Sequence, residues 1–323
     1  MPYLIGTDEA GYGPNLGPLV IGASVWEVPP ETPAETLFDR IERVVTPVLP
    51  SAGDSRLPMA DSKVLYKAGG GLEVLEQSLL PALAVAGSPV RKWRELWTAV
   101  VHRGNKCEGF DSLPWHVNFD LELPLDANRE SVAAGFPKLD DGLAAAKVRL
   151  MNLSAAALFP REFNEVVRRT DSKGEALSLT TLRLVERMLD ELPDVGDVQV
   201  TCDKHGGRDR YAALLQHVFS DSLVSIRREG RAESSYRFVH QGRQIDFFFL
   251  AKGERLLPPA LASMLAKYLR ELAMKPFNGF WQRHVPGLRA TAGYPEDAIR
   301  FRKDIAEMQK QLGIADEILW RCR

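Results

Sequence analysis

Four acidic positions follow or end apolar stretches that are typical of buried β-strands. Asp8 and Glu9 come after Tyr-Leu-Ile-Gly-Thr, and Asp203 comes after Val-Gln-Val-Thr-Cys. Glu254 follows Phe-Phe-Phe-Leu-Ala-Lys-Gly. Sites in open α/β sheets form where strands end, so these carboxylates have the placement of a shared site. Each acid taken alone is more often a turn residue or a helix N-cap.

Carboxylates that gather at one edge of a sheet repel one another unless a divalent cation neutralises them. Their hard oxygen atoms suit Mg²⁺ or Mn²⁺. We therefore predict that Asp8, Glu9, Asp203 and Glu254 are catalytic residues and ligands of one metal site that holds two ions. In such a site one metal activates a water molecule, and the other stabilises the leaving 3′ oxygen of an in-line displacement.

Five short motifs follow one another along the chain. They are Gly6-Thr7-Asp8-Glu9-Ala10-Gly11-Tyr12-Gly13-Pro14, Asp61-Ser62-Lys63 with Leu65, the strand-end Asp203, Lys252-Gly253-Glu254 with the helix 260–267, and Gly293-Tyr294-Pro295. Their types and order resemble those of the ribonuclease HII/HIII family. That family opens on an Asp-Glu-Ala-Gly-Arg-Gly-Pro type of sequence and carries a Gly-Tyr-Pro or Gly-Thr motif near its end.

The resemblance implies a ribonuclease H fold and a divalent metal. It also implies cleavage of RNA in RNA–DNA hybrids, or at ribonucleotides in duplex DNA, that leaves a 3′ hydroxyl. The substrate-binding residues that it implies are Gly11, Tyr12 and Gly13 near the ribose, Lys63 at a phosphate and Tyr294 stacked on a sugar.

Two departures from the family pattern bear on the substrate and on the metal. Tyr12 stands where the family usually has Arg, so a charged phosphate contact is lost, and the ring either stacks on the nucleic acid or fills space. Glu254 replaces the usual fourth Asp and has a longer, more flexible side chain. Asp246, near the same strand, is an alternative fourth ligand.

These departures leave two alternative functions open. A nuclease of the same fold that acts on DNA or on structured junctions is favoured by Tyr12. A nucleic-acid-binding protein whose catalytic site has decayed is favoured by Glu254. A metal titration separates the second alternative from the two nucleases, and a panel of labelled duplexes separates the nucleases from each other.

The elements that must position these residues are predicted from apolar periodicity and turn residues. Strands are expected over residues 3–7, 18–28, 94–104, 116–124, 197–202, 224–228, 235–240 and 244–250. Gln241-Gly242 is expected to form a hairpin turn between the last two strands. Helices are expected over residues 33–48, 69–86, 129–148, 160–168, 176–192, 208–219, 258–274 and 296–312. Strands that alternate with helices predict the α/β class, here a ribonuclease H-like mixed β-sheet flanked by helices. We expect a single domain over residues 1–323, with an insertion at about 90–150 and a C-terminal helical region from about residue 258.

The composition is that of an ordinary globular protein and argues against several classes. The 323 residues are 45% hydrophobic and carry a formal net charge of −2, so any nucleic acid must bind one positive face. No apolar run reaches the roughly 18 residues of a membrane span, and the N-terminal run has no basic lead typical of a signal peptide. Three widely spaced cysteines indicate neither a disulfide framework nor a zinc site. We expect a cytoplasmic monomer that binds nucleic acid and no membrane.

Overall fold

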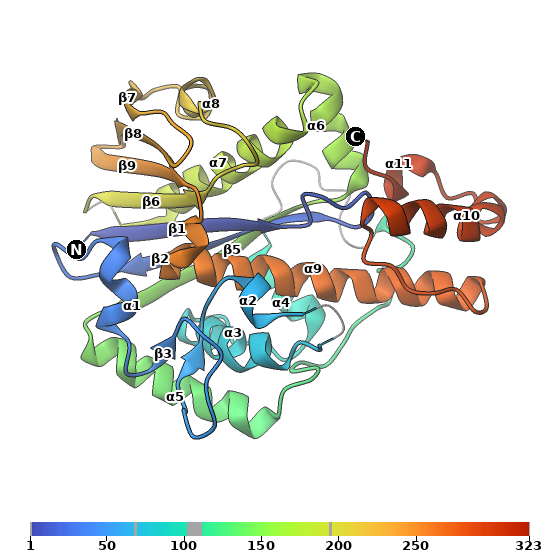
Figure 1. The fold of residues 1–323 in the computed structure, drawn as a ribbon, viewed down its shortest axis with the longest axis horizontal. Coiled ribbons are helices and arrows are strands. Elements are labelled where there is room, and N and C mark those ends of the chain that lie inside the picture. Colours follow the sequence, from blue (N-terminus) through green and yellow to red (C-terminus); the bar gives the residue numbers. More distant parts are fainter. Residues whose placement is uncertain (1, 68–69, 102–111, 194–195, 323) are drawn as a thin grey trace.

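A seven-stranded mixed sheet forms the centre of the computed structural model, which describes residues 2–67, 70–101, 112–193 and 196–322. The strand order is β5-β2-β1-β6-β9-β8-β7 (Figure 1). The central strand β1 (Tyr3–Ala10) runs antiparallel to β2 (Leu19–Glu27) and parallel to β6 (Val198–Asp203). β6 in turn runs parallel to β9 (Arg243–Leu250). The mixed β-sheet flanked by helices that the sequence predicts is confirmed.

The remaining strands extend the sheet at both edges. β5 (Arg149–Leu158) pairs with β2, and β8 (Glu233–His240) links β9 to β7 (Ser225–Arg228). Gln241 and Gly242 connect β8 to β9 with φ of 51° and 79°, the positive values that two-residue hairpins of matching twist require. The predicted hairpin at this position is therefore confirmed. A separate pair of short parallel strands, β3 (Val45–Thr46) and β4 (Leu57–Pro58), lies outside this sheet.

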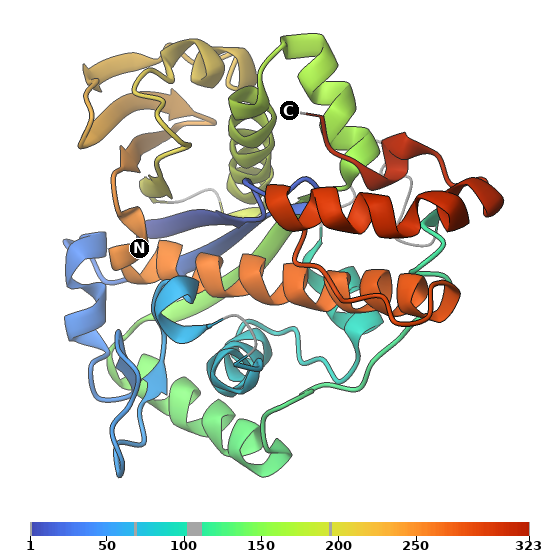
Figure 2. The ribbon, with the colours of Figure 1, turned by 45° about the vertical axis from the view of Figure 1, so that its right-hand side comes forward.

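The long helix α9 (Leu257–His284) covers one face of the sheet across β1 and β2 (Figures 1 and 2). Two glycines permit this close packing. A Cβ on Gly6 would lie 2.1 Å from the Pro258 carbonyl carbon, and one on Gly22 would lie 2.2 Å from the Ala262 carbonyl oxygen. Behind α9, the core continues into α3 (Glu73–Val85) and α5 (Arg129–Ala145).

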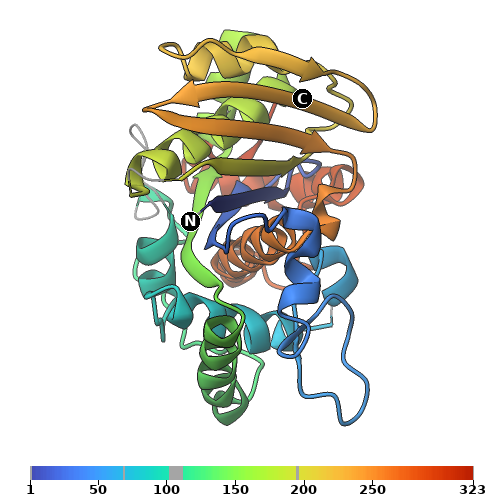
Figure 3. The ribbon, with the colours of Figure 1, turned by 90° about the vertical axis from the view of Figure 1, so that its left-hand side faces the viewer.

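The opposite face of the sheet is covered by helices from the middle of the chain (Figures 1 and 3). These are α6 (Pro160–Thr170), α7 (Lys173–Glu191) and α8 (Ala212–Val218). Because side chains of a strand alternate between faces, Leu4 of β1 belongs to the core under α9, whereas Tyr3 and Ile5 belong to the core under α7. The sheet is thus buried on both faces, and functional side chains reach solvent at its strand ends.

The chain ends in two helices, α10 (Pro295–Gln311) and α11 (Asp316–Leu319), which lie beside α9 and α6 (Figure 2). Together with α9 they confirm the predicted C-terminal helical region. Short helical elements complete the described chain: η1 (Ala34–Thr36), α1 (Leu37–Arg40), α2 (Ser62–Leu65), α4 (Trp93–Val100) and η3 (Gly253–Arg255).

Three local predictions are wrong. The strand predicted over 94–104 is wrong for its described part, because Trp93, Leu96, Trp97 and Val100 of α4 are buried at helical spacing. Residues 102–111 lie outside the described part. Residues 116–124 contain turns and a single bridge to residue 92, rather than a strand. The predicted helix 33–48 is limited to η1 and α1, and β3 follows it. The edge strand β5, in turn, was not predicted.

Within the described chain, no helix has the length and apolar character needed to cross a lipid bilayer.

Candidate active site

Asp8 and Asp203 lie at the same level on neighbouring parallel strands. Thr7 of β1 is aligned with Cys202 of β6, and each acid is the next residue of its strand. Neighbouring strands are about 4.8 Å apart, so the register alone brings the two acids together. Each acid has the strand-end position that its sequence pattern predicts, and the parallel pairing of β1 with β6 makes the two acids neighbours.

Glu254 approaches this pair through the 3₁₀ turn η3. The Gly253 N–H donates to Asp203 Oδ1 at 3.0 Å, and a Cβ on Gly253 would lie 3.0 Å from the Cys202 carbonyl oxygen. The turn therefore sits directly on the end of β6. Burial, the charge of Asp203 and a side-chain hydrogen bond with Asp203 raise the pKa of Glu254. Glu254 Oε2 is buried and has no hydrogen-bond partner among the described residues.

Asp8 and Glu9 occupy opposite faces of β1 near the end of the strand, and the charge of Asp8 raises the pKa of Glu9. Burial raises the pKa of Asp8 to about 7, an effect that the charge of Asp203 reinforces and a hydrogen bond from Ser263 opposes. Burial, Asp8 and Asp203 together raise the pKa of Glu9 to about 8. The strand end therefore carries more negative charge than its surroundings stabilise.

A fifth acid, Asp61, completes the acidic surroundings and was not predicted as a site residue. Asp61 caps α2 by accepting from the Lys63 N–H at 3.0 Å. Ser263 of α9 donates to Asp61 Oδ1 at 3.3 Å and lies 3.0 Å from the Ser62 hydroxyl. Ser263 therefore ties the Asp-Ser-Lys motif to the helix that covers Asp8.

Lys63 is the cation of this cluster. Its Nζ is 3.9 Å from Asp61 Oδ2, and its side chain is 78% exposed. Burial opposes the charged form, but the charges of Asp61, Asp8 and Glu254 outweigh it and raise the pKa of Lys63. An exposed, fully charged ammonium at the rim of an acidic cluster can bind a phosphate without displacing the carboxylates.

The acidic cluster suits a divalent metal by its chemistry, although its side chains are not gathered around one point. As the side chains stand, no three His, Cys, Asp or Glu residues of the described chain are grouped closely enough to hold one ion. The chemistry of the group fits nevertheless, because it offers hard carboxylate oxygens, raised pKa values and the unpartnered Oε2 of Glu254. A cation bound here would relieve the repulsion that raises these pKa values.

The loop after β1 packs on a buried arginine that the sequence did not single out. Gly11 has a φ of 87°, and a Cβ on it would lie 2.4 Å from Arg270 Nε. Arg270 of α9 also donates to the carbonyls of Leu16 at 3.3 Å and Ala292 at 2.9 Å. It thus joins the loop of the first motif to the loop that precedes Tyr294. In the sequence, the only signal that could have pointed to Arg270 is its position about one helical turn after Lys267.

Tyr12 is half-buried between the first loop and the helices of the opposite face. Lys173 Nζ is 5.3 Å from the centre of its ring, and a Cβ on Gly206 would lie 3.9 Å from the ring. Burial and the charge of Glu9 raise the pKa of Tyr12, while Arg208 lowers it. Lys173 and Arg208 therefore supply positive charge near the position at which the family usually has Arg.

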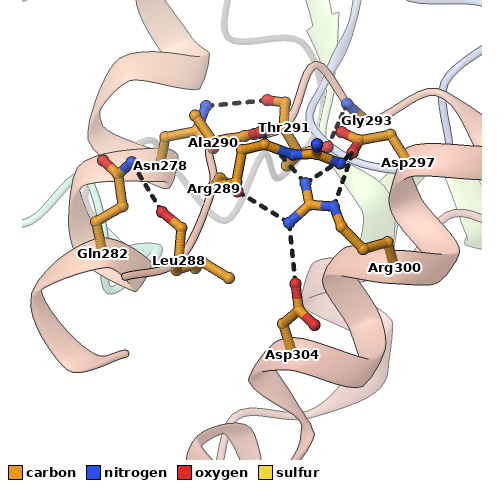
Figure 4. Close-up of polar contacts among 10 residues, drawn as sticks. All are labelled: Asn278, Gln282, Leu288, Arg289, Ala290, Thr291, Gly293, Asp297, Arg300 and Asp304. Carbon is orange, nitrogen blue, oxygen red and sulfur yellow. Dashed lines mark hydrogen bonds and ion pairs between the residues drawn. The ribbon is translucent and has the colours of Figure 1, made fainter. Parts of the chain in front are cut away.

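Tyr294 is presented by a rigid loop beside Gly13. Asn278 accepts from the Thr291 N–H at 2.8 Å, and Thr291 Oγ1 accepts from the Gly293 N–H at 2.9 Å (Figure 4). The Tyr294 side chain remains 57% exposed, and its ring lies 3.8 Å from where a Gly13 Cβ would stand. A tyrosine held this way can stack on a ligand that reaches Gly13.

Arg300 of α10 fixes the other side of the same loop. It donates to Asp297 at 2.7 Å, to Asp304 at 3.0 Å and to the Arg289 carbonyl at 3.1 Å (Figure 4).

Asp246, the alternative fourth ligand, lies away from the acidic cluster at the end of β6. It accepts from Arg237 at 2.9 Å and pairs in register with Gln199, well before Asp203 at the end of β6.

No family model matches the sequence, and no curated protein matches it. Solved structures of similar fold were found. A chain of the PCNA:RNase HII complex from Archaeoglobus fulgidus is 14% identical, with 99% of this chain and 94% of that chain covered and a TM-score of 0.43. The ribonuclease H2 from Pyrococcus horikoshii is 16% identical, with 98% and 92% covered and a TM-score of 0.43.

A third structure, Bst-RNase HIII in complex with Mn²⁺, is 15% identical, with 99% of this chain and 66% of that chain covered and a TM-score of 0.44. Over nearly its whole length, then, this chain is similar to solved ribonuclease HII and HIII structures, at low sequence identity.

Proposed function

We propose that this protein is a divalent-metal-dependent endoribonuclease that cleaves RNA in RNA–DNA hybrids or at ribonucleotides in duplex DNA. The observation that carries the proposal is the meeting of Asp8 and Asp203 at one level of two parallel strands, with the turn that holds Glu254 hydrogen-bonded to Asp203 through the Gly253 N–H. Clustered carboxylates with raised pKa values indicate a functional site rather than a structural one.

Asp8, Glu9, Asp203 and Glu254 would hold the metal, Mg²⁺ or Mn²⁺. Two bound ions would supply an activated water molecule and would stabilise the leaving 3′ oxygen. The chain's own residues do the positioning. Ser263 donates to Asp61 Oδ1 at 3.3 Å and so holds the Asp-Ser-Lys motif against α9, and the Gly253 N–H donates to Asp203 Oδ1 at 3.0 Å.

The substrate would lie across the two loops that Arg270 joins. Gly11 and Gly13 would offer backbone groups to the ribose, Tyr294 would stack on a sugar, and Lys63 would bind a phosphate. Tyr294 is exposed beside Gly13, and the Lys63 side chain is exposed at the rim of the acids, so both have access to a duplex.

A panel of labelled duplexes tests the proposal. All-DNA, single-ribonucleotide and RNA–DNA hybrid duplexes are incubated with the protein in Mg²⁺, in Mn²⁺ and in chelator. We expect cleavage of the ribonucleotide-containing substrates only, with 3′ hydroxyl products and only in the presence of metal. Asp8→Asn should abolish cleavage while hybrid binding stays nearly intact, because Asn keeps the shape but lacks the charge that holds the metal.

Asp140→Asn is the matched control, because Asp140 is an exposed acid on α5, which covers the core behind α9. It should cleave like the wild type. Cleavage by Asp8→Asn at a rate close to that of the wild type would show that the chemistry lies elsewhere. Cleavage of the all-DNA duplex would assign the protein to the DNA-directed alternative that Tyr12 favours.

A nucleic-acid-binding protein without hydrolytic activity is the second candidate. The observation in its favour is that three ligand groups are not gathered for one ion within the described chain. Calorimetric titration with Mn²⁺ separates the candidates. Binding that Asp203→Asn abolishes supports the nuclease, whereas duplex binding without any metal binding supports the second candidate.

A further inference from the structure

Arg321, next to the C-terminal end of the described chain, is a buried cation for which the described residues offer no counterion. Its side chain is 3% exposed, and burial lowers its pKa to about 9. None of its three guanidinium nitrogens has a hydrogen-bond partner among the described residues. Its guanidinium carbon lies 5.1 Å from the centre of the Phe163 ring, which leaves the N–H edge of the group unsatisfied.

The neighbouring charges do not compensate Arg321. Asp316 pairs with Arg302 at 3.0 Å, and Glu317 pairs with Arg161 at 3.2 Å, so both nearby carboxylates already have a partner. The positive charge of Arg270 adds to the effect of burial and also lowers the pKa of Arg321. A buried charge without a partner is strongly unfavourable, so the arrangement indicates that an anion belongs there.

Arg321 lines an open cavity of about 490 Å³ that could admit such an anion. The cavity lies between the loop after β1, α6, α10 and α11. It is also lined by Asn15, Asn164, Arg302 and Pro295, and by the paired carboxylates of Asp316 and Glu317. Figure 2 shows the chain end between α6 and the two C-terminal helices. A backbone hydrogen bond holds the chain end against the loop after β1: the Arg321 N–H donates to the Asn15 carbonyl at 2.9 Å.

We propose that this cavity is a second binding site, distinct from the acidic cluster, in which Arg321 binds the oxyanion of a phosphate ester. A guanidinium binds phosphate oxygens through two parallel N–H donors. The buried guanidinium of Arg321 has such donors without an acceptor among the described residues. Two sources share this chemistry: a backbone phosphate of a bound nucleic acid, and the phosphate of a free nucleotide. Pro295, which lines the cavity, follows Tyr294 directly, so a strand that contacts Tyr294 passes near its mouth.

Thermal unfolding in inorganic phosphate, compared with chloride at equal ionic strength, tests the site without requiring any activity. Phosphate at about 100 times its Kd should raise the Tm of the wild type by about 3 °C or more, whereas the Tm of Arg321→Gln should not change. In chloride alone, Arg321→Gln should have a Tm at or above that of the wild type, because an uncompensated buried charge has been removed.

Two further variants complete the design. Arg149→Gln removes an exposed arginine at the far end of β5 from α6, and it should keep the full phosphate response. Arg321→Lys keeps the charge but loses the fork, and it should show a smaller phosphate response than the wild type. If Arg321→Gln does not fold, the phosphate response of Arg321→Lys is compared with that of the wild type instead.

Duplex and nucleotide binding then identify the source of the phosphate. If the ligand is a backbone phosphate, Arg321→Gln lowers the slope of log K against log salt for duplex binding by about 0.9. If it is a free nucleotide, that slope is unchanged, and nucleoside monophosphates raise the Tm of the wild type alone. A phosphate response that Arg321→Gln retains, or a wild type without any response, overturns the proposal.

Discussion

Replacing Asp8 by Asn should change the pH dependence of stability in the metal-free protein. The free energy of unfolding of Asp8→Asn, minus that of the wild type, should be larger at alkaline pH than at acidic pH. Burial and the charge of Asp203 raise the pKa of Asp8 from 3.8 to about 7. A carboxyl group whose pKa rises on folding binds its proton more tightly in the folded state. Its stabilising contribution is therefore greatest below the unfolded pKa and is lost as the pH rises through the folded pKa.

The size of the effect follows from the two pKa values. Each pKa unit corresponds to about 1.4 kcal/mol, so ionisation of Asp8 costs the folded state about 2–3 kcal/mol more at about pH 8 than at about pH 5. Removing the charge of Asp8 also relieves Glu9, whose pKa Asp8 helps to raise to about 8. Both contributions have the same sign.

Urea unfolding in chelator at the two pH values measures the effect. The quantity is the free energy of unfolding of Asp8→Asn minus that of the wild type, which should increase by about 2–3 kcal/mol from the lower to the higher pH. Any pH-independent cost of placing an amide at this position cancels in the comparison. The exposed-site variant Asp140→Asn should show no comparable increase.

A saturating divalent metal should shift the difference in stability in favour of the wild type. Metal at about 100 times its Kd stabilises the protein that binds it by about 2.7 kcal/mol, and Asp8→Asn should not gain this stability. A pH-independent difference between the two proteins in chelator would refute the argument, because it would mean that the Asp8 carboxyl is not forced to ionise against its surroundings.

Three further changes test the loops around the site. Gly11→Ala should destabilise the fold by about 2 kcal/mol or more, because its φ is 87° and its Cβ would overlap Arg270, whereas Gly13→Ala should be nearly neutral; urea unfolding compares them. Tyr12→Arg should tighten binding of a single-ribonucleotide duplex and steepen its salt slope by about 0.9, and weaker binding in an affinity titration would contradict this. Lys63→Ala should weaken duplex binding and lower that slope without changing the Tm, since its side chain is 78% exposed.

The strand-end positions of the acids could be read from the sequence, because an apolar run that stops at an acid is a local pattern. The same holds for the hairpin at Gln241 and Gly242, whose residue types suit positive φ. Local patterns gave wrong predictions where the same pattern of apolar residues suits both a strand and a helix. The tryptophans and leucine of α4 suit a strand as well as a helix, and only packing against the core decides between them.

The sequence by itself determined which residues could do chemistry: Asp8, Glu9, Asp203 and Glu254, each at the end of an apolar run. The tertiary structure decided what surrounds them. Ser263 contacts Asp61 across 202 positions of the chain, and no local periodicity encodes such a contact. Arg270 and Arg321 read as ordinary charged residues in the sequence. They become structural and binding groups only because α9 and the chain end are packed against the loop after β1, where burial removes the water that would otherwise satisfy them.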